Sequence, residues 1–114
     1  MKTATLLLDL SVDDAATCIE RRLVGDATKV DDYRIPGLPC QVRVLVFDEY
    51  YFRVKARLTL VAVLDDASGG TRLRATASGG GGMIFDFDWG ASGSFFSALR
   101  DALEGHIVGS SEWP

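Results

Sequence analysis

Apolar and polar residues alternate along most of the chain, as is typical of β-strands with one buried face and one solvated face. The alternation is clearest at 50–64, where apolar residues occupy the even positions. It recurs at 71–78 and at 83–89, on either side of a run of four glycines. We therefore predict three antiparallel strands in these segments, joined to the preceding part of a sheet.

The first part of the chain predicts a strand at 3–10, followed by a helix. Ser11 is a suitable N-cap, the next apolar residues follow helical spacing as far as Leu23, and Gly25 is placed to end the helix. Two further strands are predicted at 28–35 and at 40–47, and Asp48-Glu49 reads as a turn after the second of them.

A second amphipathic helix is predicted to begin near Ser92 or Ser94 and to continue to Ile107. The elements together predict an α+β fold: an antiparallel sheet of about five or six strands, an amphipathic helix after the first strand, and a long C-terminal helix packed on one face. The 114 residues suit a single domain, 1–114, in which 109–114 is expected to be a loose C-terminal tail.

This order of elements resembles that of the helix-grip proteins, the family of pollen allergens and lipid-transfer domains, and implies a two-layer sandwich. The segment 77–90 contains the glycine run and the sequence Phe-Asp-Phe-Asp-Trp-Gly. It resembles a small bacterial family that has no established activity to carry over.

Composition excludes several classes of function. The chain is 47% hydrophobic and 25% charged, as in ordinary globular proteins, and its net charge of −4 gives no overall attraction to nucleic acid or to anionic membranes. Cys18 and Cys40 read as small core residues of a reducing compartment, and Leu6–Leu8 is too short for a signal peptide, so we expect a cytoplasmic protein. Two distant cysteines and one histidine do not form a metal site, and no cofactor motif is present.

Two clusters have both a functional and a structural interpretation. The glycine run at 79–82 lacks the Lys-Ser or Lys-Thr of a phosphate loop, which favours a bulge, a bend or a close approach of strands. Five basic residues are expected on one face of two neighbouring strands: Arg53, Lys55, Arg57, Arg72 and Arg74. They could bind an anion, but an ordinary solvated face with cross-strand ion pairs is favoured.

No motif commits the chain to a reaction, so three hypotheses about its function remain open. The first is a non-enzymatic binding module for a small apolar ligand. Its groove would lie between the last strand and the second helix, lined by Phe85, Phe87, Trp89, Phe95 and Phe96. The least favoured of the three is an enzyme that uses Asp86, Asp88 or His106, because the sequence provides none of them with the partner residues that catalysis needs.

The second hypothesis is a homo-oligomeric interaction domain. Val61 and Val63 fall on the otherwise charged outer face of their strand. Because contiguous exposed apolar surface usually marks a contact, we expect a homodimer through this patch or through a strand edge.

Overall fold

The structure is a computed structural model that describes residues 2–51, 56–79 and 88–111, with the side chains of all of these except 2, 51, 56, 79 and 88–94. Its elements, in chain order, are β1 (Lys2–Leu8), α1 (Val12–Leu23), β2 (Thr28–Arg34), β3 (Val42–Tyr51), β4 (Ala56–Asp65), β5 (Thr71–Gly79), α2 (Asp88–Ala102) and β6 (Ile107–Ser111). The fold is therefore α+β, as predicted.

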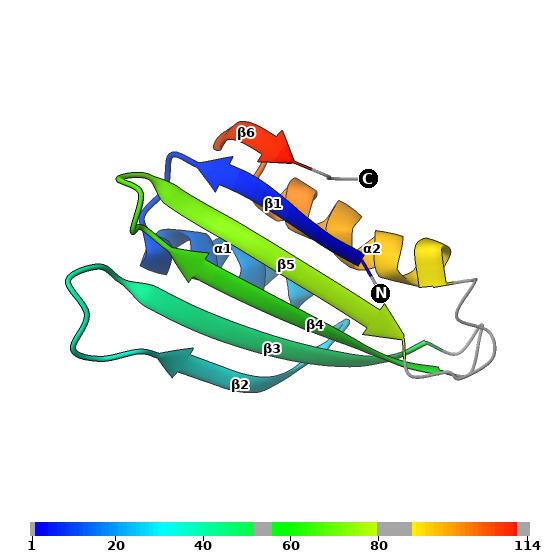
Figure 1. Cartoon of the computed structure of the whole chain (residues 1–114). Helices are drawn as coiled ribbons and strands as arrows, with labels where there is room; N and C mark the ends of the chain where they lie inside the picture. The colour runs from blue at the N-terminus through cyan, green and yellow to red at the C-terminus, as the bar shows by residue number, and fades with distance from the viewer. Residues whose placement is uncertain (1, 52–55, 80–87, 112–114) are drawn as a thin grey trace.

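The strands form one six-stranded sheet in the order β2-β3-β4-β5-β1-β6, and every neighbouring pair is antiparallel. β1 lies between β5 and β6, so α1 carries the chain across the sheet from β1 to the far edge at β2. Both helices lie on the same face of the sheet, and the described residues form no second layer on the opposite face (Figure 1).

The core fills the space between the sheet and the two helices. Every strand from β3 to β5, together with β1, sends alternate apolar side chains toward the helices, and Leu6, Leu60 and Leu73 are fully buried there. α1 contributes Ile19, and α2 contributes Leu99, both with no exposed surface. The predicted inward positions of β1 and β5, and those of β4 from Leu58 onward, are confirmed. Tyr50 was also predicted to point inward, but it lies in β3, on the face away from the helices, and is 43% exposed. The predicted α1 is confirmed, and its N-cap Ser11 accepts a hydrogen bond from the Asp14 N–H at 3.0 Å.

The predicted boundary between the third and fourth strands is wrong. Asp48 and Glu49 do not form a turn; they lie within β3, where Asp48 pairs with Thr59 and Glu49 with Leu58 of β4. Tyr50 also belongs to β3, so the predicted long strand at 50–64 is two antiparallel strands. Apolar alternation continues across the connection, so it does not reveal where one strand ends and the next begins.

The end of the chain also differs from the prediction. Asp88 and Trp89 lie in α2 rather than in a strand, while most of the predicted strand at 83–89 lies outside the described residues. The predicted long C-terminal helix is not found, because α2 ends at Ala102 and Gly105 takes a positive φ of 86° that L-residues rarely adopt. β6 then pairs with β1, so residues 109–111 are not a loose tail.

The edge strand β2 is held by charges rather than by burial. All seven of its residues are exposed. On the side that faces α1, Arg43 of β3 donates two hydrogen bonds to the Asp32 carboxylate, at 2.8 and 2.7 Å. The same guanidinium reaches Asp13 and Glu20 of α1 at 3.1 and 3.3 Å. Its side chain is only 12% exposed, so these contacts are partly shielded from water.

Two further cations of β2 complete this network. Lys29 Nζ bridges Glu20 and Asp32 at 2.9 and 3.1 Å, and Arg34 Nη1 lies 2.6 Å from Asp13. The hydrogen bonds from Arg43 hold the pKa of Asp32 well below its usual range, and Arg34 lowers the pKa of Asp13. The bond to Glu20 raises the pKa of Lys29. The network therefore fastens β2 and β3 to α1.

The facing of β4 can be tested with one residue type at two adjacent positions. Leu60→Asn places an amide in the core and removes a fully buried side chain, so we expect it to cost about 4 kcal/mol of unfolding free energy. Thr59→Asn lies on the opposite face and should change it by less than about 1 kcal/mol. Urea denaturation of both variants measures this difference, and equal losses would contradict the assigned faces.

The charge network predicts a dependence of stability on pH. The folded-state pKa of Asp32 lies below its unfolded value, so its contribution is fully present above about pH 4 and is lost as the pH falls toward the folded pKa. We expect Asp32→Asn to be about 1–2 kcal/mol less stable than the wild type at pH 6. The difference should shrink at pH 2.5.

The comparison is made by urea denaturation at both pH values. Burial raises the pKa of Glu49, which favours the folded state at low pH, but this contribution is common to both proteins and cancels. Glu104→Gln is the matched control, because Glu104 is exposed and has no ion pair in the part of the chain that the structure describes. A difference between wild type and Asp32→Asn that stays constant with pH would contradict this role of Asp32.

Candidate interaction surface on the open face of the sheet

The face of the sheet that the helices leave uncovered carries an apolar patch in its middle. Leu45 and Phe47 of β3 are buried on the helix side, so their neighbours Val44 and Val46 point to the open face. On β4, Val61 and Val63 alternate in the same way with buried residues. We call these four residues the valine patch.

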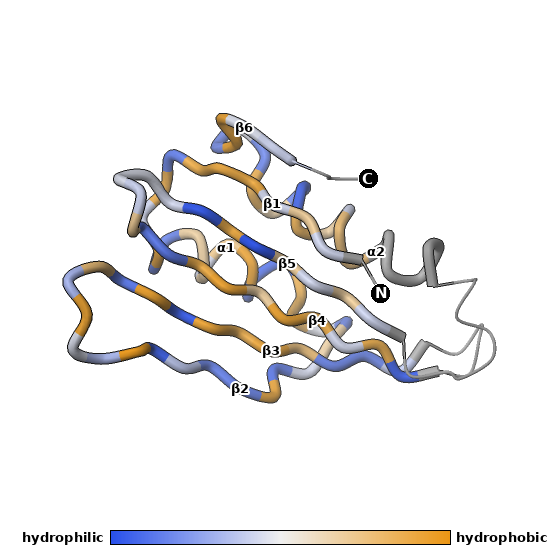
Figure 2. Tube along the Cα trace, in the orientation of Figure 1, coloured by the Kyte–Doolittle hydropathy of each residue, from blue (hydrophilic) through white to orange (hydrophobic). Residues whose placement is uncertain are grey.

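The register of the sheet joins the valine patch into two cross-strand pairs. Val44 lies opposite Val63, and Val46 lies opposite Val61. Figure 2 shows the result, since the central stretches of β3 and β4 are hydrophobic over consecutive residues rather than at alternate ones. All four side chains are partly exposed.

The β5 side of the patch is basic. Leu73 and Ala75 are buried on the helix side, so Arg72 and Arg74 point to the open face. Arg72 Nε pairs with Asp65 at 3.2 Å. Arg74 Nη1 donates only to the Thr5 hydroxyl, at 3.0 Å, and has no carboxylate partner among the described residues.

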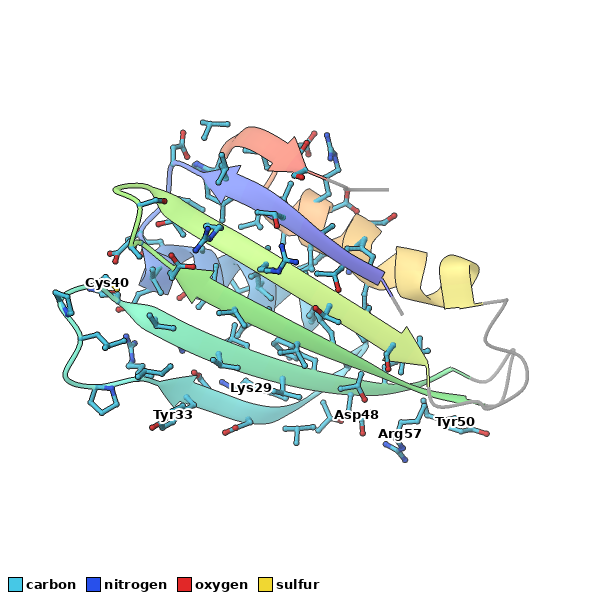
Figure 3. The ribbon with its side chains drawn as sticks, in the orientation of Figure 1. Lys29, Tyr33, Cys40, Asp48, Tyr50 and Arg57 are labelled. Atoms are coloured by element: carbon cyan, nitrogen blue, oxygen red, sulfur yellow. The ribbon has the colours of Figure 1, made fainter. Side chains whose placement is uncertain are left out.

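The β2 side of the patch is aromatic and acidic. Tyr33 lies opposite Val44 and Asp31 lies opposite Val46, so both side chains share the open face with the valines. Tyr33 is 52% exposed at the edge of the sheet, where Figure 3 labels it. The Asp31 carboxylate accepts a hydrogen bond from the Asp32 N–H, and no cation reaches it in the part of the chain that the structure describes.

The predicted basic face is only partly a cluster of free cations. Arg57, Arg72 and Arg74 point to the open face as predicted, while Arg53 and Lys55 lie outside the described residues. Arg57 Nη1 pairs with Asp48 Oδ2 at 2.7 Å, and the two side chains lie together near Tyr50 in Figure 3. Cross-strand ion pairs therefore account for Arg57 and Arg72, which was the interpretation that the sequence favoured.

The predicted aromatic groove is not assembled from the residues that the structure places. Phe95 and Phe96 are each 1% exposed and belong to the core, so neither lines an open groove. Phe85 and Phe87 lie outside the described residues, and Trp89 lies in α2 without a described side chain. The groove stays a prediction for those three residues.

The residues considered for catalysis are not brought together. His106 lies after α2, not on it as predicted, and its Nδ1 lies 2.9 Å from the carboxylate of Asp9, the residue that follows β1. Asp86 lies outside the described residues, and Asp88 begins α2. Within the described ranges no group of His, Cys, Asp and Glu is arranged to hold a metal ion. Cys18 and Cys40 are free thiols, each partly buried.

The open hollows that described residues line contain none of the predicted site residues. One, of about 310 Å³, lies beside the loop that joins β2 to β3 and is lined in part by Ile35, Leu38 and Cys40. Another, of about 350 Å³, lies between the end of α2 and the start of β6. No helix among the described residues has the length and apolar character needed to cross a membrane.

Sequence reasoning identified only half of the valine patch. Val61 and Val63 were found because their strand alternates clearly, but Val44 and Val46 lie in a run of apolar residues that reads as a buried strand. The continuous apolar run Val44–Phe47 could have identified Val44 and Val46, because a strand with apolar residues on both faces needs packing partners on both faces.

Comparison with known proteins identifies a family. No curated protein and no solved structure matches the chain, so the resemblance to the helix-grip proteins stays a prediction. A family model does match residues 1–107, which is nearly the whole chain, and its description is a family of unknown function, DUF6054. The chain belongs to this family.

Proposed function

We propose that the protein is a self-associating interaction domain that buries the open face of its sheet against a second copy of the chain. The observation that carries the proposal is the valine patch, four β-branched apolar residues in two cross-strand pairs on a face that neither helix covers. Removing such surface from water is favourable by about 25 cal/mol per Å².

The character of the face favours a protein partner over a small ligand. The valine patch lies on adjacent strands of a sheet, and small-molecule sites are concave, whereas sheets pack on one another over broad surfaces. The charged residues around the patch surround it as a polar rim surrounds the apolar centre of an interface. Both signs of charge occur at its borders, so the surface is able to complement itself.

A strand edge is the second contact surface to consider, and the two edges differ. β2 carries four charged residues and a register shift between Lys29 and Asp31, features that oppose edge-to-edge pairing. β6, at the other edge, has the sequence Ile-Val-Gly-Ser-Ser and no charge. Pairing at β6 would use backbone hydrogen bonds and would leave the valine patch exposed.

Substitution of the patch separates these possibilities. We expect the double variant Val61→Lys with Val63→Lys to be monomeric at concentrations where the wild type is a dimer, because it places two charges in the apolar centre of the contact. Sedimentation equilibrium measures the dissociation constant, which should rise more than 100-fold. Both positions are partly exposed, so the variant should retain its fold by circular dichroism.

The control is Ser110→Lys in β6, which adds a charge to the sheet edge and should leave association unchanged. A wild type that stays monomeric at millimolar concentration would overturn the proposal. If the patch variant remained a dimer and Ser110→Lys dissociated, association would use the β6 edge instead.

A further inference from the structure

The two borders of the valine patch carry opposite charges that have no partner of opposite charge within the described residues. Arg74 on β5 has only the Thr5 hydroxyl, whereas Arg57 and Arg72 on the same face each have a carboxylate. Asp31 on β2 has no cation, whereas its neighbour Asp32 has two on the other face. Two such charges beside an apolar contact are free to pair with opposite charges on a second molecule.

The two strands that carry these charges are placed symmetrically about the middle of the patch. In the order β2-β3-β4-β5, a line between β3 and β4 has β2 and β5 at equal distances on either side. The register places Tyr33, Val44, Val63 and Arg74 in one row across these four strands. Asp31, Val46, Val61 and Thr76 form the next row.

A face-to-face dimer of a sheet has two simple choices of two-fold axis in the plane of the contact. An axis perpendicular to the strands lays each strand on its own copy, so the basic border of β5 meets the basic border of the partner subunit and the acidic border of β2 meets the acidic one. An axis parallel to the strands, between β3 and β4, lays β5 on β2 and β3 on β4. Only the second choice brings opposite charges together, and like charges brought together across a contact cost binding energy.

We propose that the two copies are related by this parallel axis and that Arg74 and Asp31 determine the pairing. Each Val44 then packs on Val63 of the partner subunit, and each Val46 packs on Val61 of the partner subunit. Arg74 lies over the ring of Tyr33 of the partner subunit, one row from Asp31 of the partner subunit, which an arginine side chain is long enough to reach. A guanidinium over a tyrosine face is a favourable cation–π contact. The inference rests on the proposed self-association.

An exchange of charges tests the arrangement. Arg74→Glu sets two acidic groups against each other at both ends of the dimer, and Asp31→Lys sets two basic groups there. Each variant alone should bind itself at least 10-fold more weakly than the wild type does. In a one-to-one mixture every end of a mixed dimer joins an acidic group to a basic one, so the mixed dimer should recover to within about 3-fold of the wild-type dissociation constant.

The measurement uses sedimentation equilibrium of each variant and native mass spectrometry of the mixture, with one variant labelled with ¹⁵N. The double variant Arg74→Glu with Asp31→Lys should also dimerise with itself, because it joins opposite charges at both ends of the dimer. This result would show that neither substitution prevents folding and that each single variant loses affinity through its unmatched charges. Circular dichroism checks the fold of each one.

The outcomes separate this inference from the proposed function. If both single variants dimerise like the wild type, while the double variant Val61→Lys with Val63→Lys is monomeric, the face is the contact but the arrangement is wrong. Weakened single variants that do not recover when mixed also overturn the arrangement. A monomeric wild type overturns the proposed function, and this inference with it.

Discussion

The sheet has two faces and the fold provides one layer of helices, and most features of the molecule follow from this imbalance. α1 and α2 cover one face, where every strand from β3 to β5 buries alternate apolar residues. The opposite face has to be polar, or it has to find a cover from outside. Much of it is polar, with arginine, threonine and aspartate on β5, β1 and the end of β3, although Leu7 of β1 is 44% exposed there, and its centre is apolar. The valine patch is therefore apolar surface that neither helix of the fold covers.

The border of this patch depends on electrostatics on the other face of the sheet. β2 buries none of its residues, so the usual contribution of the hydrophobic effect is missing for this strand. It is held by its backbone pairing with β3 and by the network in which Arg43 joins Asp32 to Asp13 and Glu20 of α1. Because successive residues of a strand point to opposite faces, the anchoring of Asp32 toward α1 also fixes Asp31 and Tyr33 on the open face. One strand thus places Asp32 in the charge network on the helix side and places Asp31 and Tyr33 beside the valine patch on the open side.

The sequence predicted what depends on local pattern and failed where the information is non-local. The inward residues of β4 and β5, the α1 helix and its Ser11 cap all follow from periodicity within a few residues. The break between β3 and β4 does not, because Asp48-Glu49 resembles a turn locally and is shown to be strand only by its pairing with Thr59 and Leu58. That single error hid the opposition of Val44 and Val63, and with it the size of the patch. β6 was missed for a similar reason, since a short run such as Ile107–Ser111 becomes a strand only beside β1.

On the open face, the valine patch provides affinity, whereas the charges at its borders provide specificity for one partner. Valine pairs would attract any apolar surface of suitable shape, because the hydrophobic effect has no direction. Charges at the borders do have direction, and they are paired within the chain everywhere on this face except at Arg74 and Asp31, as far as the described residues extend. An unpaired arginine and an unpaired aspartate on opposite sides of one apolar patch penalise a partner that lacks the matching order of charges. A second copy of the chain, rotated about an axis parallel to the strands, carries the matching order of charges by symmetry. Each copy then presents Arg74 toward the acidic border of the other copy and Asp31 toward its basic border.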